Sequence, residues 1–100
     1  MYVYMAMYEI ENPVDVREAI AMMQNLEGRI PEVIGFDVGK DKLGLPESCD
    51  VGMVVQFETF GGYSAFRSHK AILRVQTLLD RIAAKSHVVC FQSAEPDRFR

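Results

Sequence analysis

The sequence predicts an α+β fold in which helices cover one face of a four-stranded antiparallel sheet. Apolar residues alternate along four segments, which is typical of strands, and they recur at helical spacing in segments between these strands. The resulting order, β-α-β-β-α-β, has two similar halves and matches the split β-α-β arrangement. A length of 100 residues, 49% of them hydrophobic and 25% charged, indicates a single domain over 1–100.

The first half of the chain is predicted to hold a strand, a helix and a second strand. Residues 2–10 are apolar or aromatic on both alternating sets, which predicts a strand buried on two faces. Asn12 is expected to cap an amphipathic helix over 14–27. Residues 33–39 alternate again and predict the second strand. Because 40–49 carry glycine, proline and several charges, they are expected to form a surface loop.

The second half begins with the clearest strand. In 50–58 the larger apolar residues alternate with glycine, valine and polar residues, and Gly61–Gly62 are expected to end this strand. A short helical piece over 63–67 is expected to lead into a longer helix capped by Ser68. That longer helix has a core-facing apolar stripe, which consists of Ala71, Ile72, Val75, Leu78, Leu79 and Ile82.

The last strand is expected over 87–92, and 93–100 are expected to form a polar C-terminal tail. Like the first strand, the last one is apolar on both alternating sets. The predicted helices can cover only one face of the sheet, so something outside the chain must cover the other face. A second copy is the economical solution, because two-fold homodimers are the commonest soluble oligomers and two such sheets can form a barrel. We therefore expect a homodimer with a dimeric β-barrel.

Charge and hydrophobicity limit the classes of partner that the protein is expected to bind. The 11 lysine and arginine residues against 14 acidic residues give a net charge of −3, whereas nucleic-acid binders normally show a basic stripe. No apolar run approaches the roughly 18 to 20 residues that cross a bilayer. Neither a nucleic-acid nor a membrane partner is therefore expected.

The start of the sequence lacks the basic residues of a signal peptide, which predicts a cytoplasmic protein. Its thiols should then be reduced, and we interpret Cys49 and Cys90 as small core or near-core residues. Because the histidines and cysteines are few and lack ligand spacing, neither a metal nor a cofactor is expected.

Four segments resemble a known family when they are taken in order. They are Ile-Pro-Glu-Val at 30–33, Gly-Lys-Asp at 39–41, the strand at 50–58 and Ser-His-Lys at 68–70. The pattern resembles the stress-responsive A/B barrel (Dabb) family, over nearly the whole chain. The resemblance implies a ferredoxin-like fold and a dimeric barrel, in agreement with the burial argument. The related dimeric barrels of the antibiotic-biosynthesis monooxygenase type are the alternative.

One step of the family pattern is altered. Where the family has Tyr-x-x-His-Pro-x-His, this sequence has Phe66 for the tyrosine and Ile72 for the second histidine, while His69 matches the first histidine. The resemblance implies that polyketide-cyclising members use the tyrosine and the second histidine as an acid/base pair. Phe66 and Ile72 cannot transfer protons, so the same cyclase mechanism is not expected here.

Two functional hypotheses follow. In the first, the protein binds a small apolar or aromatic molecule in a cavity between sheet and helices, with Phe66, His69 and Ile72 as the contacts. In the second, it is a cofactor-independent enzyme of the cyclase or monooxygenase type, acting on an aromatic or polyketide-like substrate. Only His69 and Tyr63 could then transfer protons. His69 can also be interpreted as a solvated or helix-capping residue, and His87 as an edge-strand residue. The missing acid/base pair favours the first hypothesis, and whether the protein is an enzyme stays open.

Overall fold

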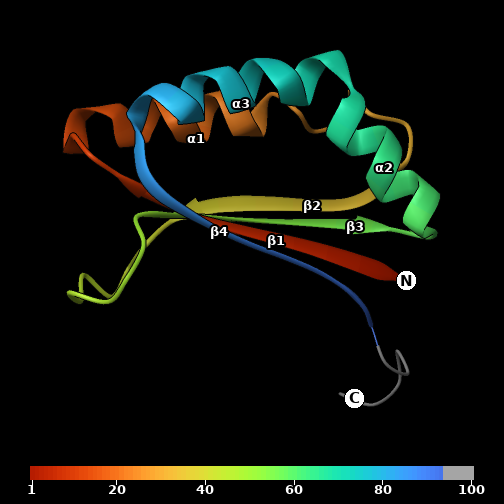
Figure 1. Ribbon diagram of the computed structural model, residues 1–100, viewed down its shortest axis with the longest axis horizontal. Coiled ribbons are helices and arrows are strands. Elements are labelled where there is room, and N and C mark those ends of the chain that lie inside the picture. Colours follow the sequence, from red (N-terminus) through yellow and green to blue (C-terminus); the bar gives the residue numbers. More distant parts are fainter. Residues whose placement is uncertain (94–100) are drawn as a thin grey trace.

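The computed structural model describes residues 1–93 and shows four strands and three α-helices (Figure 1). The strands are β1 (Tyr2–Ile10), β2 (Val33–Lys40), β3 (Val51–Phe57) and β4 (Ala83–Gln92). The helices are α1 (Val16–Gln24), α2 (Phe60–Ser68) and α3 (Lys70–Ile82). All strand pairs are antiparallel and the sheet order is β2-β3-β1-β4. The predicted fold class is therefore confirmed, while the predicted tail lies outside the described residues except for Ser93.

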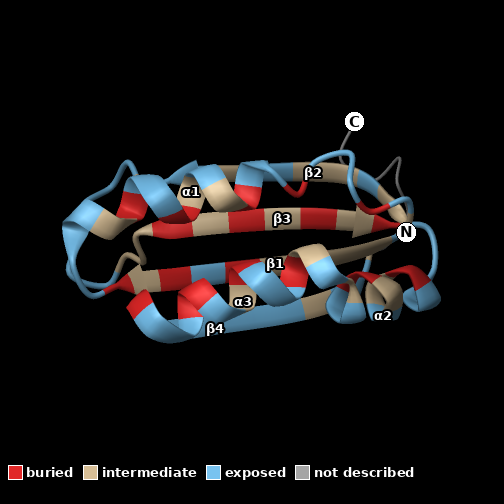
Figure 2. Cartoon of the chain, turned by 90° about the horizontal axis from the view of Figure 1, so that it is seen from above, coloured by how far each residue is buried: buried red, intermediate tan, exposed pale blue. Residues whose placement is uncertain are grey.

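All three helices lie on one face of the sheet (Figure 1). Seen from above, the buried residues of β1 and β3 lie beneath them (Figure 2). The alternation predicted for β3 is confirmed, since Val51, Met53, Val55 and Phe57 are all buried. In α3 the predicted stripe is buried apart from Ala71, which is half-buried. None of the helices within residues 1–93 is long and apolar enough to span a membrane.

The predicted cap Asn12 caps a 3₁₀ turn, and the α-helix that follows is shorter than predicted. Asn12 accepts a hydrogen bond from the backbone N–H of Val14 through Oδ1 at 3.2 Å. The turn that follows is a 3₁₀ helix (Pro13–Asp15), so α1 itself begins at Val16. Gly28 follows the helix with a φ of 78°, a left-handed conformation that glycine adopts without steric cost.

Two expectations about the turn after β3 are wrong. Gly61 and Gly62 do not end the strand, because β3 ends at Phe57 and both glycines lie in the first turn of α2. Thr59 caps that helix through Oγ1, which accepts from the N–H of Gly62 at 3.1 Å. A Cβ at position 62 would lie 3.2 Å from the Cβ of Phe57, a tight contact that glycine avoids. Ser68 does not cap α3, since it is the last residue of α2.

The last strand is longer than predicted. It begins at Ala83, directly after α3, rather than at His87. Residues 83–86 have no apolar alternation, yet Lys85 and Ser86 continue the pairing with β1. Pairing with β1 thus outweighs the weak intrinsic strand preference of this segment.

The sheet face opposite the helices is called the bare face here. It carries the residues of each strand that alternate with the helix-facing set. Strand register arranges them in rows, which are Phe91, Val3, Gln56 and Gly35; Val89, Met5, Val54 and Asp37; His87, Met7, Gly52 and Gly39; and Lys85 with Glu9. The first two rows are mainly apolar and the last is charged. In the single chain, β1 is buried on its helix-facing set only, and the set on the bare face is half-buried or exposed.

Candidate functional site

Two of the predicted ligand contacts lie inside the core. Phe66 is 0% exposed, and its ring centroid lies 5.7 Å from that of Tyr4 and 5.4 Å from that of Phe57. Ile72, in the first turn of α3, is 4% exposed. Neighbouring side chains surround both residues, and neither lines a hollow described below.

His69 lies between α2 and α3 and caps α3. Its backbone is extended, and Nδ1 accepts a hydrogen bond from the N–H of Ala71 at 3.0 Å. It also lines a hollow of about 610 Å³ together with Arg29, Lys70 and Arg74. None of the residues lining this hollow carries a hydroxyl group. The hydrogen bond to Ala71 therefore agrees with the interpretation of His69 as a helix-capping residue.

Tyr63, the other predicted proton-transfer group, belongs to an aromatic cluster. Its ring centroid lies 5.5 Å from Tyr4, 6.1 Å from Phe57 and 5.3 Å from Phe60. It does not line the hollow that His69 lines. His69 and Tyr63, the two proton-transfer candidates of the enzyme hypothesis, therefore do not share this hollow.

Buried hydroxyl groups do occur on the helix-facing side of β1. Tyr4 accepts a hydrogen bond from Nη1 of Arg67 at 3.1 Å and is hydrogen-bonded to Tyr8. Burial raises the pKa of Tyr8, and its interaction with Tyr4 raises it further. Burial also raises the pKa of Tyr4, although the nearby Arg67 charge opposes this effect. Both phenols are therefore protonated at neutral pH and serve the packing of the core.

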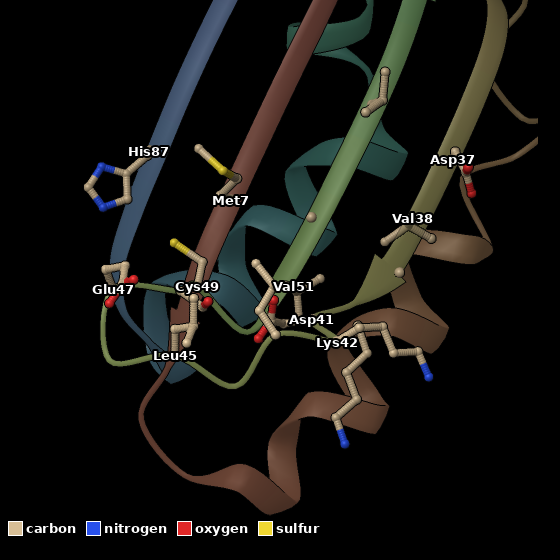
Figure 3. Close-up of a pocket in the computed structure, with 16 residues that line it drawn as sticks. Met7, Asp37, Val38, Asp41, Lys42, Leu45, Glu47, Cys49, Val51 and His87 are labelled. Atoms are coloured by element: carbon tan, nitrogen blue, oxygen red, sulfur yellow. The ribbon is translucent and has the colours of Figure 1, made fainter.

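The larger hollow lies on the bare face (Figure 3). Its volume is about 930 Å³, within the size range of small-molecule sites. Gly39 and Gly52 face each other across β2 and β3, and a Cβ on either would meet no atom within 4 Å. This pair of glycines therefore creates space on the sheet. The apolar residues that line the hollow are Met7, Val38, Leu43, Leu45, Val51 and Val54.

The loop between β2 and β3 forms the wall of this hollow and is fixed by two aspartates. Asp41 accepts a hydrogen bond from the N–H of Gly44 through Oδ2 at 2.7 Å. Asp50 accepts through Oδ2 from the N–H of Ile10, also at 2.7 Å. Backbone hydrogen bonds from Asp41 to Asp50 and from Asp50 to Tyr8 close the loop onto the sheet. The hollow is thus built on anchored backbone.

A cluster of three side chains lies at the edge of this hollow. Glu9 comes from β1, Cys49 from the loop and His87 from β4, and their possible ligand atoms all lie within 4.8 Å of one another. Figure 3 shows Cys49 and His87 in this region, with Met7 on the neighbouring strand β1. Burial, followed by the negative charges of Glu9, Asp50 and Asp41, raises the pKa of the Cys49 thiol. This thiol is therefore protonated at neutral pH in the absence of a cation.

Sequence reasoning missed this cluster because no local spacing indicates it. Glu9 and His87 become diagonal neighbours only because β4 pairs with β1, in a register that places His87 opposite Met7. Cys49 reaches them only through the path of the loop. A search for ligands within short sequence windows could not have found three residues so far apart.

Comparison with known proteins is informative about the family and the fold. The family model described as stress responsive A/B barrel domain matches residues 3–93. None of the curated proteins matches the chain. Three solved structures share the fold at TM-scores of 0.83, 0.80 and 0.78.

The first is a dimeric ferredoxin-like protein of unknown function from Thermobifida fusca, 19% identical, with 92% of this chain and 90% of that chain covered. The second, from Bacteroides fragilis, is a dimeric protein of unknown function with a ferredoxin-like fold, 10% identical, with coverage of 92% and 95%. The third is a hydroxynitrile lyase from Passiflora edulis, 13% identical, with coverage of 95% and 96%.

Proposed function

Because this chain belongs to the stress responsive A/B barrel domain family, we propose that it is a homodimer that binds a small apolar or aromatic molecule. In this proposal the two bare faces pack against each other and enclose the larger hollow. The single observation that carries the proposal is the apolar part of the bare face.

This apolar surface spans neighbouring strands. Met5 lies between Val54 and Val89 in one row, and Val3 lies beside Phe91 in the next. Val89 is 48% exposed and Phe91 is 42% exposed in the single chain. Burying such a surface contributes roughly 25 cal/mol per Å² of apolar area. Contiguous apolar patches of this kind mark interaction surfaces, and a second copy fits because similar folds are described as dimeric.

The hollow supports the ligand part of the proposal. Its floor contains Met7 and Val54, and Leu45 lies on the loop. A partner sheet packed over the first two rows would exclude water from this floor, which favours a flat apolar ligand. Asp41 and Lys42 at the rim would orient polar substituents.

The pocket predicted between sheet and helices stays a prediction. Phe66 and Ile72 are packed in the core, so a ligand that touched both would require the corner between α2 and α3 to open. His69 would then lose its capping hydrogen bond to Ala71. The hollow on the bare face requires no such rearrangement.

A cofactor-independent enzyme is the second candidate function. The observation in its favour is the fold shared with a hydroxynitrile lyase. Fold alone is a weak argument for chemistry, and His69 and Tyr63 do not line a common hollow. Binding without turnover is therefore the preferred proposal.

The dimer is tested by its mass in solution. Sedimentation equilibrium or light scattering at micromolar concentration is expected to give about twice the 11.3 kDa of one chain. The physical reason is that a single chain leaves the apolar rows in water. A monomer across the micromolar range would contradict the proposal.

The ligand site is tested by filling it. Gly52→Val places a β-branched side chain in the space opposite Gly39 and is expected to abolish the thermal stabilisation that aromatic compounds give the wild-type protein. Gln56→Val is the matched control, because it lies on the same strand and face but outside the hollow. Equal stabilisation of both variants by the same compound would place the ligand elsewhere.

A further inference from the structure

The geometry points to a metal site: Glu9, Cys49 and His87 form a three-ligand site for a divalent cation of the zinc type, at the edge of the hollow on the bare face. All three residues belong to one chain. This inference therefore does not depend on the dimer or on the aromatic ligand.

The donor set indicates which cation is bound. A thiol sulfur, an imidazole nitrogen and a carboxylate oxygen lie within 4.8 Å of one another. Sulfur and imidazole ligands select zinc, cobalt and related transition metals over magnesium and calcium, which prefer oxygen ligands. With ligand bonds of about 2.0 to 2.3 Å, tetrahedral zinc separates its ligand atoms by roughly 3.3 to 3.8 Å. Side-chain rotations that move the donor atoms by about an ångström would bring them into that geometry.

The three side chains are available for coordination. Within residues 1–93, none of them makes a side-chain hydrogen bond or ion pair. His87 is exposed, and Glu9 and Cys49 are half-buried, so their side chains can rotate without disturbing the core. Each donor is attached to fixed backbone, since Glu9 and His87 lie in paired strands and Cys49 immediately precedes the anchored Asp50.

Charge also favours a cation at this place. Glu9, Asp50 and Asp41 all interact electrostatically with Cys49, so the cation would meet a net negative environment, even though Lys85 lies opposite Glu9. Coordination would break the S–H bond of Cys49, form a sulfur–metal bond and release the proton to water. The bound cation would thereby stabilise a thiolate that burial and the acidic neighbours otherwise disfavour.

The number of ligands gives the site its chemistry. Zinc sites with three protein ligands keep a fourth position for water or a substrate. Cys49 and His87 line the hollow, so the fourth position would face into it. A small molecule with a carboxylate, thiol or hydroxamate group is the ligand class that this position would take.

Cobalt(II) binding tests the inference, because a thiolate ligand gives cobalt a strong charge-transfer absorption in the near ultraviolet. The wild-type chain, purified with reductant and without metal, is expected to bind about one cobalt ion and to show this absorption. Zinc should displace the cobalt and abolish the signal. Cys49→Ser should remove the absorption, and Glu9→Gln and His87→Asn should each weaken binding by at least about 10- to 100-fold, the loss seen when only an outer-shell partner is removed.

The chain offers a matched control for two of the three ligands. It contains two cysteines and two histidines, and the second member of each pair lies outside the cluster. Cys90→Ser and His69→Asn should therefore bind cobalt as the wild type does, the asparagine retaining a helix-capping oxygen. Circular dichroism confirms that every variant is folded. Absence of cobalt absorption in the folded wild type, or its persistence in Cys49→Ser, would overturn the inference.

Discussion

Replacing Met5 with glutamate is expected to convert the proposed homodimer into a folded monomer. Met5 lies between Val54 and Val89 on the bare face, so the new carboxylate would be buried against the partner without a counterion. An unpaired buried charge costs several kcal/mol, enough to dissociate a dimer of moderate affinity. Sedimentation should show about 11.3 kDa, and circular dichroism should remain that of the wild type.

Two controls make this result specific. Ala6→Glu, at the adjacent position, points toward the helices where Ala6 is 0% exposed, and it should unfold the chain rather than dissociate it. Leu73→Glu, on the exposed side of α3, should leave both mass and stability nearly unchanged. If Met5→Glu remained dimeric, the bare face would not be the interface.

Phe66→Ala is expected to lower the free energy of unfolding by about 3 to 5 kcal/mol, because it removes a buried aromatic ring and leaves a cavity. Phe66 contacts the rings of Tyr4 and Phe57 between helix and sheet. Urea unfolding measures the change. The same substitution at Phe60, which is 53% exposed, should cost much less.

The outcome at position 66 also bears on its function. A loss below about 1 kcal/mol would contradict a core role, and it would favour the predicted ligand pocket between sheet and helices. A large loss of unfolding free energy, together with stabilisation of the variant by small aromatic compounds, would show that these compounds fill the cavity left in the core by the removed ring.

The regular elements could be predicted because their apolar periods are strong. The alternation in 50–58 and the stripe of α3 are properties of single segments, and packing against one sheet enforces both. The turn after β3 differs from the prediction because Thr59 caps a helix there, so Gly61 and Gly62 lie in its first turn. Position 62 also lies close to Phe57, which leaves little room for a side chain.

The site was less predictable than the fold for a related reason. Both alternating sets of β1 are apolar, so the sequence could not show which set faces the helices. The cluster of Glu9, Cys49 and His87 depends on strand order and on a loop. Neither property has a local sequence signal.

The central position of β1 has a consequence for how the chain folds. β1 pairs with β4 along nearly its whole length, and these two segments are separated by most of the sequence. The entropy of closing so long a loop must be overcome before the pairing contributes stability. During synthesis β1 can pair with β3 but has an open edge until β4 has been made. A chain interrupted before Ala83 would keep that edge, with its unpaired N–H and C=O groups, available to other chains, and would be prone to aggregation.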